Sequence, residues 1–198
     1  MKTFGRWTGP ILLGVATLAM SPAAANGYRE KNKAVTVANS SMTVTPSRDW
    51  NQLSAKPGKK AETWTLDGDQ LNDVTWFAGI APGEPLLREV SKKRKPLPKL
   101  TGQTLLVEIP ELLEATYRST KDIATFKVTG SAADRFLGQD GIRFTYEYVD
   151  NDNLPRKGEA RAILANHLLY MVTFDAPRLH FYDRSLQDFH ALSDSAHL

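Results

Sequence analysis

The chain has 198 residues, of which 25 are basic, 22 are acidic and none is cysteine. The lack of cysteine excludes a disulfide framework and also the lipid-accepting thiol of a bacterial lipoprotein. If the first 25 residues are removed as a leader, Lys2 and Arg6 are lost, and 23 basic residues remain against 22 acidic ones. That near-balance removes the global charge argument for nucleic-acid binding, which favours a strongly basic domain.

The first 25 residues have the composition of a secretory signal peptide. A basic start is followed by an apolar run over residues 11–20 and by small side chains over residues 21–25. The run is about half of the roughly 20 residues that a membrane-spanning helix needs. We therefore expect cleavage after Ala25 and a periplasmic or secreted protein, and no later stretch is apolar enough to span a bilayer.

The mature part is expected to be one domain covering residues 42–198. Residues 26–41 are polar, which predicts a mobile lead-in. Met42 and Val44 alternate with threonines and predict a first strand. Strands over residues 62–66 and 73–80 flank an Asp-Gly-Asp turn and predict a hairpin.

Residues 81–99 have the most unusual composition in the chain. Four prolines surround a run of basic residues, which predicts an exposed loop. The candidate contacts with a protein or anionic envelope partner are Lys92, Lys93, Arg94, Lys95 and Lys99, with Lys56, Lys59 and Lys60 as possible neighbours in space. A loop that serves only solubility is the alternative.

The remaining elements alternate between helix and strand. Helical spacing predicts a helix from Pro110 to about Thr120 and a final helix that includes Tyr182 and Phe189. Extended structure is expected at residues 123–128, 142–148, 159–164 and 168–174, with a hairpin loop over 150–158 and a tight turn at 165–167. Strands joined in hairpins with helices outside them indicate an α+β fold with a central antiparallel sheet.

Three segments resemble the second half of the PsbP and Mog-type α/β sandwich. They are residues 138–146 (GQDGIRFTY), 168–174 (LLYMVTF) and 189–195 (FHALSDS), so the resemblance lies mainly within residues 100–198. It implies a central antiparallel sheet between helices, used by relatives as a non-enzymatic adaptor for protein partners. No partner-binding residue of those relatives matches this chain.

No segment has a complete catalytic or metal-binding pattern. The loop beginning at Asp150 starts like a calcium site, but Pro155 and Arg161 occupy the positions of its glycine and glutamate. His190 and His197 are two turns apart on one predicted helix face, a spacing that does not match a zinc site. We therefore predict no catalytic residue, no metal and no cofactor, and a protein that is not an enzyme.

Aromatic residues leave two alternatives open. The side chains of Trp50, Trp64, Trp76, Phe144, Tyr146 and Tyr148 form the core or line a cavity for a small apolar ligand. The favoured interpretation is an exported non-enzymatic binding module. A retained ligand would favour the small-ligand binder, and a buried titratable cluster in a cleft would favour a hydrolase of unknown class.

Overall fold

The computed structural model describes residues 27–91, 96–123 and 125–198. The predicted signal peptide and four of the predicted contact residues therefore lie outside the described residues; these four are Lys92, Lys93, Arg94 and Lys95. Of the helices within the described ranges, none is long and apolar enough to cross a membrane.

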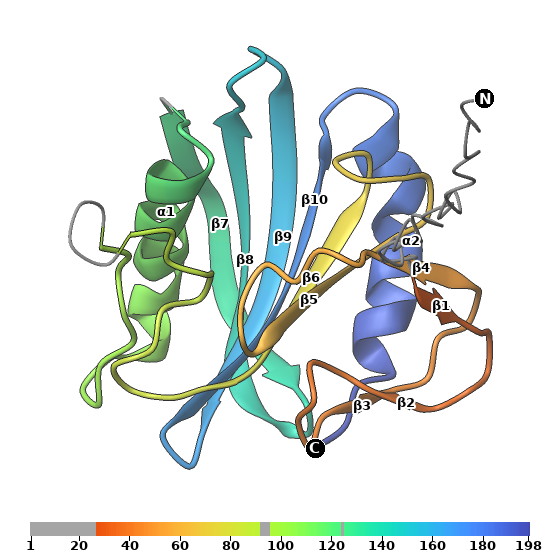
Figure 1. The fold of residues 1–198 in the computed structure, drawn as a ribbon, viewed down its shortest axis with the longest axis horizontal. Helices are drawn as coiled ribbons and strands as arrows, with labels where there is room; N and C mark the ends of the chain where they lie inside the picture. Colours follow the sequence, from red (N-terminus) through yellow and green to blue (C-terminus); the bar gives the residue numbers. More distant parts are fainter. Residues whose placement is uncertain (1–26, 92–95, 124) are drawn as a thin grey trace, which may run out of the picture.

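The centre of the fold is an eight-stranded antiparallel sheet with the order β1-β4-β5-β6-β10-β9-β8-β7 (Figure 1). Its strands are β1 (Gly27–Arg29), β4 (Trp50–Gln52), β5 (Ala61–Thr65), β6 (Asp73–Ile80), β7 (Thr125–Phe136), β8 (Gln139–Val149), β9 (Pro155–Ala165) and β10 (Leu168–Pro177). β2 (Val35–Thr36) and β3 (Thr43–Val44) form a separate two-stranded sheet. The expected hairpin between β5 and β6 is confirmed, and pairing of β6 with β10 joins the two halves of the chain.

Two helices cover opposite faces of the main sheet and confirm the α+β prediction (Figure 1). A short 3-10 helix (Leu106–Glu108) leads into α1 (Ile109–Thr120), and α2 (Phe181–Asp194) follows β10. The core under α2 includes the three predicted tryptophans, and the core under α1 includes the aromatic row of β8. These side chains are at most 3% exposed, so core packing accounts for them.

Regular structure is already present at Gly27, whereas the sequence predicted a mobile lead-in up to residue 41. β1 is the edge strand of the main sheet and pairs through its backbone with β4. The Arg29 Nη2 atom lies 3.5 Å from a carboxylate oxygen of Glu62, which is buried. Val37 is fully buried in the core under α2. Part of the expected lead-in therefore belongs to the domain.

Strands β7 and β9 are longer than the patterns of apolar residues predicted. β7 continues past Val128 to Phe136, with a shift in its pairing to β8 between Val128 and Gly130. This extension has little apolar alternation, so its strand conformation depends on backbone pairing with β8. β9 begins at Pro155, which shortens the expected loop to residues 150–154.

Candidate functional site

Of the segment predicted to be an exposed loop, the described residues 81–91 and 96–99 are packed against the domain in part. The backbone N–H of Leu100, directly after this segment, donates to the Glu84 carbonyl at 3.1 Å. Leu86 and Leu97 are buried, and Leu86 belongs to the core under α1. We call residues 81–91 and 96–99 the stem, because each of these two parts buries a leucine in the domain. The four basic residues 92–95 lie between the two parts in the sequence.

A close backbone approach holds this stem against the turn before β5. The Arg88 N–H donates to the Pro57 carbonyl at 2.7 Å. A Cβ atom added to Gly58 would lie 2.7 Å from the Leu86 carbonyl oxygen, closer than real Cβ contacts. Only glycine therefore allows the stem to lie this near to Gly58 without a shift.

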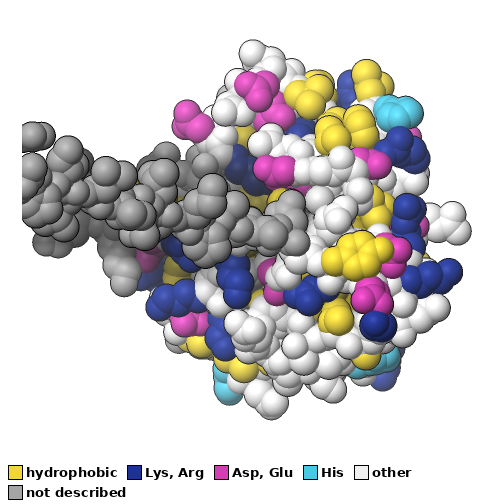
Figure 2. Space-filling view, turned by 45° about the vertical axis from the view of Figure 1, so that its right-hand side comes forward, with side chains coloured by type: hydrophobic (Ala, Val, Ile, Leu, Met, Phe, Trp, Pro, Cys, Tyr) yellow, Lys and Arg dark blue, Asp and Glu magenta, His cyan; other side chains and the backbone are white. Residues whose placement is uncertain are grey.

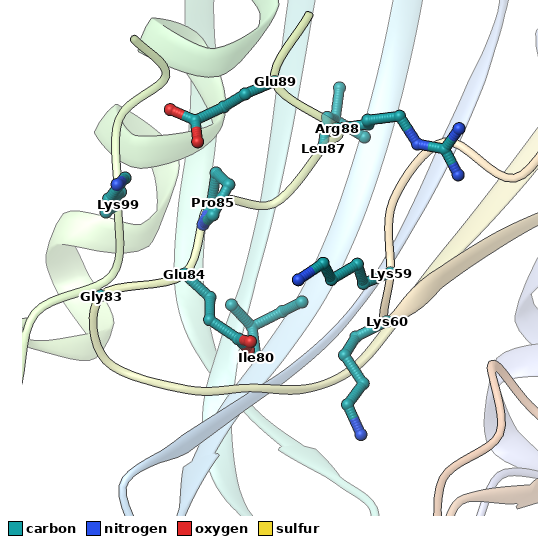
Figure 3. Close-up of a pocket in the computed structure, with 10 residues that line it drawn as sticks. All are labelled: Lys59, Lys60, Ile80, Gly83, Glu84, Pro85, Leu87, Arg88, Glu89 and Lys99. Atoms are coloured by element: carbon teal, nitrogen blue, oxygen red, sulfur yellow. The ribbon is translucent and has the colours of Figure 1, made fainter. Parts of the chain in front are cut away.

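A pocket of about 440 Å³ lies between the stem, the two residues before β5 and the end of β6 (Figure 3). Its apolar lining comes from Ile80, Pro85 and Leu87. Its basic residues are Lys59, Lys60, Arg88 and Lys99. We call this site the basic pocket. It combines an apolar interior with a cationic rim, a combination suited to a ligand with both apolar and negatively charged groups.

The positive charges of the basic pocket exceed its negative charges. Four basic residues face two acidic ones, Glu84 and Glu89, which leaves a surplus of two positive charges. The Glu84 carboxylate accepts the Ala81 N–H at 3.1 Å, and the Glu89 carboxylate accepts the Leu97 N–H at 3.1 Å. No ion pair among the described residues involves any of the four basic side chains. Their charges are available to an external anion.

The basic side chains are spread along the pocket and do not converge on one point. Lys59 extends across the pocket towards Glu84 and Ile80, whereas the ends of Lys60 and Arg88 point outwards (Figure 3). On the face of the domain in Figure 2, in contrast, basic and acidic side chains of the described residues are intermixed. The surplus of the basic pocket therefore contrasts with the mixed charges of that face.

The structure brings together some of the predicted contact residues. Lys99 lines the basic pocket with Lys59 and Lys60, whereas Lys56 lines a different cavity, beside Glu62. Arg88 was not among the predicted contact residues, because it lies in the same segment but outside the basic run. Its position before the run was the one signal that could have identified it.

A second cavity, of about 390 Å³, contains titratable residues near the start of β6 and the end of α1. Next to it, the Asp175 carboxylate accepts hydrogen bonds from the phenol groups of Tyr117 at 2.6 Å and Tyr146 at 3.1 Å. Burial, and then the charge of Asp175, raises the pKa of both phenols. These tyrosines therefore remain protonated donors near neutral pH, in a network that links α1 to β10.

Asp73 lines the second cavity and lies directly opposite Asp175 in the pairing of β6 with β10. Burial, and then the charges of Asp69 and Asp175, raises the pKa of Asp73 to about 7. The Gln70 N–H donates to its two carboxylate oxygens at 2.9 and 3.1 Å. The structure therefore contains the kind of buried titratable cluster that would favour an enzyme.

The two histidines predicted to share a helix face do not do so. α2 ends at Asp194, and the His197 backbone instead pairs with Thr43. The His190 Nε2 atom lies 2.9 Å from a Glu159 carboxylate oxygen. Among the residues that the structure describes, no group of three or more His, Asp or Glu side chains is arranged to hold a metal ion.

Comparison with known proteins identifies the fold but no sequence relative. No family model matches the sequence, and neither does any curated protein. The solution structure of cyanobacterial PsbP (CyanoP) from Synechocystis sp. PCC 6803 is similar, with 10% identity and a TM-score of 0.54 over 93% of this chain and 98% of that one. The crystal structure of LpqN, involved in cell envelope biogenesis of Mycobacterium tuberculosis, aligns over 90% of this chain and 86% of its own, with 8% identity. Its TM-score of 0.33 is too low to show that the two folds are the same. The chain therefore has a PsbP-like α+β fold, and the likeness extends well beyond residues 100–198.

Proposed function

We propose that the protein is exported and acts in the bacterial cell envelope as a non-enzymatic binding module. It contacts an anionic component of the envelope through the basic pocket and through Lys92, Lys93, Arg94 and Lys95, which lie between Arg88 and Lys99 in the sequence. The observation that carries the proposal is the set of four basic side chains around one apolar pocket, none of them in an ion pair with another described residue.

Local charge explains how a nearly neutral domain would bind an anion. Exposed charges act over about 8–10 Å at physiological salt, so the basic pocket attracts anions even though distant acidic residues balance it. Each cation beside an anionic surface contributes about 1 kcal/mol or less. Binding should therefore require several of these cations together and should weaken as salt is added.

The test compares two variants that lose the same number of charges. In the pocket variant, Lys59, Arg88 and Lys99, all exposed at the pocket, become glutamine. In the control variant, the exposed residues Lys127, Arg143 and Arg178, outside the pocket, become glutamine. Both proteins are sedimented with phosphatidylglycerol vesicles at low salt.

We expect the pocket variant to lose most of the sedimented fraction, and we expect the control variant to behave like the wild-type protein. Added salt should release the wild-type protein from the vesicles. Equal sedimentation of the pocket variant and the wild-type protein would remove the proposal, because the basic pocket would then make no contribution to anion binding.

A further inference from the structure

We infer that the basic pocket binds an acidic segment of a protein partner, with one apolar side chain of that segment inside the pocket. The inference rests on the proposed function and names its partner by chemistry. The apolar side chain would contact Ile80, Pro85 and Leu87, and acidic residues on either side of it would lie beside the basic rim.

The shape of the pocket favours an apolar side chain as its occupant. Its volume of about 440 Å³ is within the roughly 300–1,000 Å³ of typical ligand sites. Protein interfaces commonly concentrate their binding energy in one apolar or aromatic residue that fills such a pocket. Ile80 is 1% exposed and Leu87 is half-buried, so the lining is held by the core under α1.

The arrangement of charge favours a partner with several separated negative charges. A ligand with a single anionic head would require cations that converge on one point. Here Lys59 points into the pocket, whereas Lys60 and Arg88 point outwards on its rim (Figure 3). An extended segment with acidic residues on both sides of an apolar residue matches this distribution, and charge complementarity of this kind gives specificity.

The stem presents the pocket in a fixed conformation. Backbone hydrogen bonds hold Arg88 to Pro57 at 2.7 Å and Leu100 to Glu84 at 3.1 Å. The partner therefore does not have to order this wall of the site when it binds, which lowers the entropic cost of association.

A library of random peptides displayed on phage tests the inference without knowledge of the partner. The library is selected on the purified wild-type protein at low salt and is depleted on the pocket variant. We expect the enriched peptides to contain one large apolar residue with at least two acidic residues near it. Enriched peptides without acidic residues would overturn the inference, and so would a failure to enrich any peptide.

Affinities of the best enriched peptide then locate its binding site. Loss of the three pocket charges in the pocket variant should weaken binding about tenfold, since each exposed ion pair contributes modestly. Leu87→Ser should also weaken binding, whereas the control variant should match the wild-type protein. Equal affinity for the pocket variant, or displacement of the peptide by dodecanoate as the tighter ligand, would overturn the inference. Pocket-dependent vesicle binding without peptide binding would refute the inference and leave the proposed function standing.

Discussion

Replacement of Asp73 by asparagine should make the domain more stable at alkaline pH. Asp73 lies opposite Asp175 on neighbouring strands, and like charges in that position destabilise a sheet. Burial, with the charges of Asp69 and Asp175, raises the pKa of Asp73 from 3.8 to about 7. The asparagine amide is similar in shape and carries no charge, and its oxygen can still accept the Gln70 N–H.

The direction of the pH dependence follows from proton binding. Between about pH 4 and pH 7 the folded protein retains a proton on Asp73 that the unfolded chain has lost, so folding is favoured by low pH in this window. Stability should fall by about 1.4 kcal/mol for each pH unit, which amounts to roughly 4 kcal/mol across the window. The contribution is complete below the ordinary pKa and is lost as pH rises through the raised one.

Urea denaturation at pH 5, 6, 7 and 8 measures this effect. The free energy of unfolding of Asp73→Asn should exceed that of the wild-type protein by about 4 kcal/mol at pH 8 and by only about 1.4 kcal/mol at pH 5. Asp140→Asn is the control, because Asp140 has a fully exposed side chain and loses the same charge. Parallel pH profiles for Asp73→Asn and the wild-type protein would refute the reasoning.

Three further changes have defined outcomes. Arg161→Met removes a largely buried guanidinium that donates to Asp134 at 2.7 Å, and urea denaturation should show a loss of about 3 kcal/mol because the carboxylate is left without its partner. Gly58→Ala introduces a clash with the Leu86 carbonyl, so we expect a lower melting temperature and weaker vesicle binding, and unchanged values for both would contradict a close approach of the stem. Intact mass spectrometry of protein from the periplasm should show cleavage after Ala25, whereas the mass of the full chain would refute the predicted signal peptide.

The parts of the fold that sequence reasoning predicted well are those with strong local periodicity. The aromatic alternation of β8 and the helical spacing after Pro110 identified their elements, because burial of one face imposes the pattern directly on neighbouring residues. β1 was missed because its three residues are held by pairing with β4 and by the ion pair of Arg29 with Glu62. These contacts join residues distant in sequence, so no local pattern indicates them.

The same distinction applies to the basic pocket. Its excess of positive charge was visible in composition, and Lys99 was predicted as a contact residue. Its apolar lining was not predicted, because Ile80 ends a strand and Leu87 follows in a proline-rich segment with no regular periodicity. The two residues lie at one site because the stem folds back beside the end of β6, and this proximity depends on tertiary packing.

The tyrosines of the buried titratable cluster have a structural role. A general acid or base works best when its pKa is near the pH at which it operates. The pKa values of Tyr117, Tyr146 and Tyr148 are instead raised well above their ordinary value, chiefly by burial, so these phenols neither accept nor release a proton near neutral pH. Asp73 differs from the tyrosines, because its raised pKa of about 7 lies in this useful range. The phenols of Tyr117 and Tyr146 instead join α1 and β8 to β10 through hydrogen bonds to Asp175.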